Sequence, residues 1–215
     1  MSSERGEAPS RFSRRGFLVV VSGPSGVGKT SFCTHLLETR RDAIRSVSAT
    51  TRAPRPGEVD GRDYCFLDAD GFATRVSAGD FIEHADVHGH LYGTPRRFVD
   101  QQVGAGRIVL LNIDVQGGVQ VKERYIDSVA IFVWPPSLEA LRIRLVARAQ
   151  DDPAEIARRL ADAPGELAQY ERYDYIVVNE DLPAALSRVS AIVEAERARV
   201  SRLVPAESLT QTEER

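Results

Sequence analysis

The chain has 215 residues, of which 42% are hydrophobic and 27% are charged, proportions that are typical of one soluble globular domain. Its 28 basic and 31 acidic residues leave a net charge of −3, which gives no support to a general nucleic-acid binder. No apolar run approaches the roughly 18 residues of a membrane helix, and Cys33 and Cys65 lie far apart without a CxxC spacing. We therefore expect a cytoplasmic protein with no membrane or nucleic-acid partner, no disulfide framework and no zinc site.

Buried strands and amphipathic helices alternate along most of the chain. Residues 1–15 and about 204–215 are polar and aperiodic, so both are predicted to be disordered tails. Continuous apolar runs, typical of parallel strands buried on both faces, occupy residues 17–21, 108–111, 129–133 and 175–178. Helices are predicted at Thr30–Arg41, at Ser137–Ala149, from Asp152 onward and at Leu182–Leu203.

The helix at Ser137–Ala149 has a clear start signal. Ser137 is a good N-cap residue, and Leu138, Leu141 and Leu145 form its expected buried stripe. The segment from about 45 to 100 breaks the alternation with short runs, glycines and a polar stretch. We read it as an insertion of short antiparallel strands with one or two helices. The pattern as a whole predicts an α/β fold, with a parallel sheet, helices on both faces and one inserted subdomain.

A phosphate-binding loop follows the first buried strand. It matches G-x-x-x-x-G-K-[ST] in full, with the residues Gly23, Pro24, Ser25, Gly26, Val27, Gly28, Lys29 and Thr30. Its glycines allow backbone N–H groups to surround an anion, and the following helix adds the positive end of its dipole. Lys29 should reach the β- and γ-phosphates, and the hydroxyl of Thr30 should ligate Mg²⁺. The loop predicts a nucleoside triphosphate site, but does not separate a kinase from an ATPase, a GTPase or a binding module.

A second anion site is predicted in the insertion. Arg52 and Arg55 lie close together in a polar loop, and their planar guanidinium groups suit a phosphate. Ser48 and Tyr64 could add hydroxyl donors. A solvated basic turn is the alternative for any two arginines.

The ordered series of motifs resembles the guanylate kinase family over about residues 16–196. The segments that carry the resemblance are Gly23–Thr30, Ser48–Tyr64, Phe81–Ala85, Tyr92–Thr94, Ile113–Gly117, Pro135–Ser137 and Asp174–Asn179. It implies a P-loop NTPase-type three-layer sandwich with a parallel core sheet. It also implies a nucleoside-monophosphate-binding insertion at about 45–100 and a helical lid at about 138–160. Residues 197–215 would hold the end of the last helix and a polar tail.

The resemblance also implies an activity, namely transfer of the γ-phosphoryl group of ATP to GMP, and to dGMP, with Mg²⁺ as cofactor. Such an enzyme serves purine nucleotide metabolism and GMP recycling. ATP and GMP would be its small-molecule partners, and a homo-oligomer is left open.

Site residues follow from the same resemblance, position by position. The GMP phosphate would be held by Ser48, Arg52, Arg55, Tyr64 and Tyr92. The guanine would be read by Glu83, Thr94 and Asp114. Guanine presents N1–H and an exocyclic amino group as adjacent donors, which an ionised carboxylate can accept together, whereas adenine lacks this pair.

Four cationic residues are implied in catalysis: Lys29, Arg144, Arg148 and Arg159. The three arginines would neutralise charge on the transferring phosphoryl group, although solvated helix arginines are the plain alternative. Asn179 would lie near the adenine end of the ATP site.

The sequence departs from the family pattern at three places, of which His90-Leu91-Tyr92 in place of the usual N-Y-Y is peripheral. The usual L-D-I-D reads Leu111-Asn112-Ile113-Asp114, so a charge is lost near the expected Mg²⁺. The usual G-R-G of the lid reads Ala147-Arg148-Ala149, which should stiffen it. Two other functions fit the sequence less well. A protein-interaction module of this type would lack the intact phosphate loop, and a sugar-phosphate kinase would not need the guanine-reading residues.

Overall fold

The computed structural model describes residues 12–87, 89–147 and 153–205. The helices are α1 (Lys29–Thr39), α2 (Ala69–Ser77), α3 (Arg96–Gly104), α4 (Val115–Arg124), α5 (Leu138–Ala147), α6 (Pro153–Leu167) and α7 (Leu182–Arg197), with the 3-10 turns η1 (Tyr170–Arg172) and η2 (Val200–Arg202). The strands are β1 (Phe12–Arg14), β2 (Phe17–Ser22), β3 (Ala43–Arg45), β4 (Ala49–Thr50), β5 (Cys65–Phe66), β6 (Phe81–Val87), β7 (His90–Pro95), β8 (Ile108–Asn112), β9 (Val129–Trp134), β10 (Tyr175–Val178) and β11 (Leu203–Pro205).

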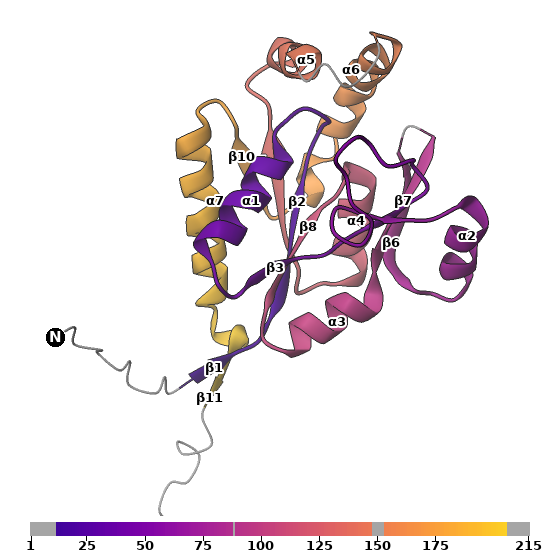
Figure 1. The fold of residues 1–215 in the computed structure, drawn as a ribbon. Coiled ribbons are helices and arrows are strands. Elements are labelled where there is room, and N and C mark those ends of the chain that lie inside the picture. The colour runs from indigo at the N-terminus through magenta and orange to yellow at the C-terminus, as the bar shows by residue number, and fades with distance from the viewer. Residues whose placement is uncertain (1–11, 88, 148–152, 206–215) are drawn as a thin grey trace, which may run out of the picture.

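A parallel sheet forms the core (Figure 1). Its strand order is β10-β9-β2-β8-β3, and each neighbouring pair is parallel. The four strands predicted from apolar runs are present, and β2, β8 and β9 are buried as predicted. For β10 the predicted burial on both faces was wrong, because β10 is an edge strand in which only Val177 is buried and Ile176 is 46% exposed. The edge strand β3 was missed because its three half-buried residues do not form an apolar run.

Helices cover both faces of this sheet, so the predicted three-layer arrangement is confirmed. Alternate residues of β2 enter opposite layers: Val19 packs in the cluster under α1 and α7, whereas Val20 packs in the cluster under α3 and α4. This alternation follows from the two-residue period of a strand. It explains why the whole run Phe17–Ser22 is buried.

The insertion forms a second sheet with the order β5-β4-β7-β6. The pairs β4–β7 and β6–β7 are antiparallel as predicted, but β4 and β5 run parallel. Helix α2 closes a small core in which the rings of Phe72 and Phe81 stack with centroids 4.8 Å apart. Helix α3, which begins at Arg96, packs on β2 and β8 of the core sheet. Residues 96–100 of the predicted insertion thus lie in a helix that packs on the core sheet, and the limits of the insertion stay a prediction.

Helices α5 and α6 lie together beyond the carboxyl end of β9, at the top of Figure 1. The Oγ of Ser137 accepts a hydrogen bond of 3.0 Å from the backbone N–H of Ala140, as a cap should. Leu141 and Leu145 are buried as predicted, but Leu138 is 48% exposed. The prediction for Leu138, the first residue of α5, was therefore wrong. The predicted helix residues 148–149 and the predicted cap at Asp152 lie outside the described residues.

Both chain ends differ from the sequence prediction within the described range. Phe12–Arg14, placed in the N-terminal tail, is strand β1, and it pairs antiparallel with β11. The closing helix ends at Arg197 and not at Leu203. The chain turns back there because Arg202, 1% exposed, lies with its guanidinium carbon 3.9 Å from the ring centroid of Phe17 and pairs with Glu196.

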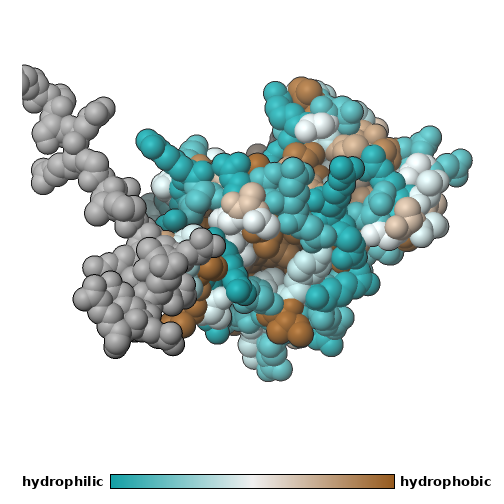
Figure 2. Space-filling view, turned by 90° about the horizontal axis from the view of Figure 1, so that it is seen from below, coloured by the Kyte–Doolittle hydropathy of each residue, from teal (hydrophilic) through white to brown (hydrophobic). Residues whose placement is uncertain are grey.

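The face opposite the lid is mostly hydrophilic, with isolated hydrophobic patches (Figure 2). Within the described ranges no helix is both long enough and apolar enough to cross a membrane.

Candidate active site

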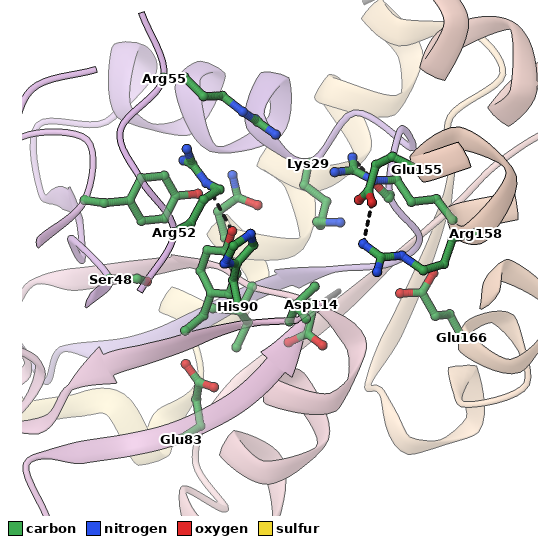
Figure 3. A pocket seen from close by; sticks show the side chains of 17 residues that line it. Lys29, Ser48, Arg52, Arg55, Glu83, His90, Asp114, Glu155, Arg158 and Glu166 are labelled. Atoms are coloured by element: carbon green, nitrogen blue, oxygen red, sulfur yellow. Dashed lines mark hydrogen bonds and ion pairs between the residues drawn. The ribbon is translucent and has the colours of Figure 1, made fainter. Parts of the chain in front are cut away.

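A cavity of about 410 Å³ lies where the phosphate loop, the insertion and the lid meet (Figure 3). Its lining residues are Ser25, Lys29, Ser48, Arg52, Arg55, Tyr64, Glu83, Val87, His90, Tyr92, Asn112, Ile113, Asp114, Glu155, Arg158, Arg159 and Glu166. The cavity thus unites residues that the sequence places over a hundred positions apart. Of the predicted GMP-binding set, Thr94 is the one behind the wall, where it contacts Glu83.

The phosphate loop connects β2 to α1. Gly28 has φ 105° and caps α1 in the left-handed region, which favours glycine. A side chain on Gly23 would place its Cβ 2.4 Å from the carbonyl oxygen of Val133, so glycine is also required there by contact. The Nζ of Lys29 donates hydrogen bonds to the carbonyls of Gly23 (2.6 Å) and Pro24 (3.2 Å). The cation is therefore held directly over the loop.

Two side chains brace the loop from outside. The carbonyl of Val27 accepts hydrogen bonds from Nδ2 of Asn179 (2.8 Å) and from Nη1 of Arg144 (3.3 Å). Arg144 also donates to the backbone carbonyl of Asn179 at 2.9 Å. Arg144 is not one of the residues that line the cavity. Its contacts are those of a group that positions the loop.

Helix α6 brings two arginines to the cavity. Arg159 donates from Nη1 to Oγ of Ser25 at 2.9 Å and from Nε to Oε1 of Glu155 at 2.9 Å. Arg158 also pairs with Glu155. Sequence reasoning missed Glu155 and Arg158. Glu155 lies three residues before Arg158 and four before Arg159, and this spacing was a visible signal for one helix face. Arg148, the third predicted lid arginine, lies outside the described residues.

Glu166 of α6 also lines the cavity and was not predicted. It lies on the same helix as Arg158 and Arg159. Burial raises its pKa, and the positive charge of Lys29 opposes this rise. Helix α6 therefore brings both positive and negative side chains to the cavity beside Ser25 and Lys29.

Arg52 is oriented by a second layer of contacts. Its Nη2 donates to both oxygens of Glu58 at 2.8 and 3.0 Å, and its Nε donates to the hydroxyl of Tyr92 at 3.2 Å. The guanidinium lies over the ring of Tyr64, 5.3 Å from its centroid. Glu58 also accepts from the backbone N–H of Arg55. Glu58, which sequence reasoning did not assign, thus ties the two predicted phosphate ligands together.

The predicted base pocket contains a buried carboxylate, Glu83, and a half-buried one, Asp114. Glu83, 2% exposed, accepts a hydrogen bond of 2.6 Å from Oγ1 of Thr94. Burial raises the pKa of Glu83 to about 7, and the nearby charge of Asp114 adds to the rise. Asp114 caps α4 by accepting from the backbone N–H groups of Gly117 (3.0 Å) and Gln116 (3.2 Å). Burial raises the pKa of Asp114 as well.

Asn112 ends β8 beside the phosphate loop. Its Nδ2 donates to Oγ1 of Thr30 at 3.3 Å. No group of three or more His, Cys, Asp or Glu side chains suited to a metal ion occurs among the described residues.

The fold and the site define a P-loop phosphotransferase. The phosphate loop with Lys29 and the arginines Arg52 and Arg55 line one cavity, which Glu83 also borders. This geometry suits a phosphorylated acceptor that carries a base with hydrogen-bond donors.

Comparison with known proteins specifies the family. The guanylate kinase family model matches residues 15–196. The guanylate kinase of Symbiobacterium thermophilum is 47% identical, with 87% of this chain and 89% of that protein covered. That of Thermotoga maritima is also 47% identical, with coverage of 87% and 91%. The crystal structure of guanylate kinase from Anaplasma phagocytophilum superposes with a TM-score of 0.78 at 38% identity, covering 94% of this chain and 96% of that one. The chain belongs to the guanylate kinase family.

Proposed function

We propose that the chain transfers the γ-phosphoryl group of ATP to GMP, giving ADP and GDP. The observation that carries the proposal is the pairing of the phosphate loop with a buried carboxylate pocket, in one cavity. Lys29 belongs to the phosphate loop, and Glu83 belongs to the carboxylate pocket. An enzyme that only hydrolyses ATP would not need the carboxylate pocket.

The base pocket supports guanine as the acceptor base. Oε1 of Glu83 already accepts from Thr94, while Glu83 also borders the cavity. A carboxylate accepts but does not donate, so it suits the adjacent N–H donors of guanine. Adenine offers no such pair at this edge and would leave a buried charge unpaired.

The outer face of the phosphate loop supports adenine binding near Asn179. Its side chain is 4% exposed, and its Oδ1 has no hydrogen-bond partner among the residues described. The exocyclic amino group of adenine would donate a hydrogen bond to this oxygen once a small movement exposes the Asn179 side chain. Arg144 would act here as a positioning residue for the loop and for Asn179.

Catalysis would consist of positioning and charge neutralisation. An oxygen of the GMP phosphate is the nucleophile, so the protein needs no general base. Arg52 and Arg55 would hold that phosphate, while Lys29 and Arg159 would face the charge that develops on the transferred group. Arg158 would add a further positive charge from the same helix. Arg148 stays a prediction of the same kind.

Mg²⁺ is the proposed cofactor. The residues fit a metal that arrives with the nucleotide, since Thr30 offers a hydroxyl and Asn112 a neutral amide. Thr30 and the phosphate oxygens of ATP would hold the ion, which supplies charge neutralisation at the phosphates when bound.

Replacing Asn112 by aspartate should raise the affinity for Mg²⁺, because a carboxylate would then stand beside Thr30. We expect the apparent Kd for Mn²⁺, measured by paramagnetic resonance in the presence of a non-hydrolysable ATP analogue, to fall by about tenfold. Asn112→Leu is the control for loss of the amide alone and should not tighten binding. An unchanged Kd for Mn²⁺ in Asn112→Asp would show that Asn112 does not lie at the metal site.

The proposed function is tested by following ADP release with GMP, AMP, UMP and CMP as acceptors. GMP should be used far better than the other three, and ATP alone should give little ADP. Preference for another monophosphate would overturn the assignment of the base pocket. Use of dGMP, a cytoplasmic location, the domain limits 16–196 and a homo-oligomer stay predictions.

A further inference from the structure

Helix α4 contains two consecutive glycines near its start, Gly117 and Gly118. Glycine is a poorer helix residue than alanine, so a glycine pair weakens the first turns. The surroundings explain Gly118, because a Cβ there would lie 2.2 Å from the hydroxyl oxygen of Tyr173. The hydroxyl of Tyr173 contacts both Oγ of Ser22 on β2 and the backbone carbonyl of Val115 on α4, so it links the helix to the core sheet. Gly117 needs a different explanation.

Gly117 lies against the two carboxylates of the base pocket. A Cβ built on it would lie 2.7 Å from Oε2 of Glu83 and 3.0 Å from Oδ1 of Asp114. Real Cβ atoms essentially never approach another heavy atom to less than 3.0 Å. Because Gly117 has no side chain, the carboxylate of Glu83 can lie directly against the first turn of α4.

Glu83 cannot withdraw easily from such a contact. Its side chain is buried, and its Oε1 is held at 2.6 Å by the hydroxyl of Thr94 on the neighbouring strand β7. Asp114 is fixed as well, because its two oxygens cap α4. A methyl group at position 117 would consequently force one of the two carboxylates away from its present position.

We propose that Gly117 is a specificity-determining positioning residue, which sets how closely Glu83 and Asp114 approach each other and so fits the pocket to the adjacent donors of guanine. This inference rests on the proposed role of Glu83 in the base pocket. Gly117 itself need not touch the substrate. It acts by leaving room for Glu83 beside the N-terminus of α4, where the helix dipole also favours a negative charge.

The test is Gly117→Ala in the full chain, with Gly104→Ala as the matched control. Gly104 is also helical, but a Cβ there would meet no atom within 4 Å. Calorimetry should show the Kd for GMP raised by at least about tenfold in Gly117→Ala, with the Kd for ATP changed by less than about twofold. The KM for GMP should rise accordingly, and Gly104→Ala should change neither affinity.

A double variant separates this role from a general structural one. If Gly117 acts through Glu83, then Gly117→Ala should have little further effect on GMP binding in a Glu83→Ala background. Equal effects in both backgrounds would overturn the proposal, as would an unchanged Kd for GMP in a folded single variant. Should the single variant not fold, a folded double variant supports the contact, and an unfolded one refutes it.

The same set distinguishes failure of the proposed function. If Glu83→Ala alone leaves GMP binding intact, the base pocket is wrongly assigned and Gly117 loses its role with it. If Glu83→Ala weakens GMP binding but Gly117→Ala does not, the pocket assignment stands and this inference is refuted.

Discussion

Replacing Lys29 by methionine should abolish phosphoryl transfer while the protein stays folded. The side chain lines the cavity and its Nζ lies over the phosphate loop, where it donates to two loop carbonyls. Methionine keeps the length and the apolar stem but removes the charge that should neutralise the transferred phosphoryl group. We expect kcat to fall by at least about a thousandfold, measured by coupled ADP release.

The chain offers a matched control for this change. Lys122, the other lysine, lies on α4 and pairs with Asp174 and the carbonyl of Ser128, away from the cavity. Lys122→Met should therefore cost some stability but leave kcat close to the unmodified value. Near-normal turnover in a folded Lys29→Met protein would place the ATP phosphates elsewhere.

Replacing Glu83 by glutamine should reduce kcat/KM for GMP by about a hundredfold, or roughly 3 kcal/mol. Glutamine has nearly the same shape, but it presents one acceptor and one donor in place of two acceptors. The amide oxygen can still accept from Thr94, so the amide N–H₂ would face the guanine donors. Steady-state kinetics should show this loss on the GMP side, with KM for ATP nearly unchanged. Loss of ATP affinity with intact use of GMP would contradict it.

The pH dependence of GMP binding should report the same carboxyl group. Burial raises the pKa of Glu83 to about 7, so in the free protein the group is largely protonated below that pH and ionised above it. The guanine donors require the ionised form. GMP affinity should therefore rise between about pH 6 and pH 8, with a proton released on binding in the lower part of this window.

Glu83→Gln provides the control for this pH profile. The phosphate of GMP titrates near pH 6, and that contribution is present in both proteins. The difference between the two profiles isolates Glu83. Identical profiles in calorimetry would show that Glu83 does not change protonation when GMP binds.

The loop from Gly23 to Thr30 shows how much local sequence can determine. Its glycines, its lysine and the apolar strand before it are continuous in the chain, so the motif and its geometry could be predicted together. The buried strands β2, β8 and β9 could be predicted for the same reason, because each is an uninterrupted apolar run. The run at β10 predicted a strand but not its exposure at the edge of the sheet. β3 and β11 could not, because they are short and acquire their pairing from distant partners.

Assigning roles to isolated polar residues required the family resemblance. By composition and spacing alone, Glu83 is an ordinary strand glutamate, and nothing nearby in the sequence marks it as buried. Burial arises because β6 pairs with β7 and packs against α4. The raised pKa is a consequence of that packing and not of the local sequence.

Tertiary structure alone decided which groups face the cavity. Arg144 and Arg159 are both helical arginines, but Arg144 turns to the outer side of the phosphate loop while Arg159 reaches Ser25. Glu155 and Glu166 join the site because α6 crosses the loop, which no local pattern specifies. The sequence by itself determined the main strands and the phosphate loop, since each depends on residues close together in the chain, and it determined the family through an ordered series of such short segments. The orientation of individual charges was decided by packing between elements far apart in sequence.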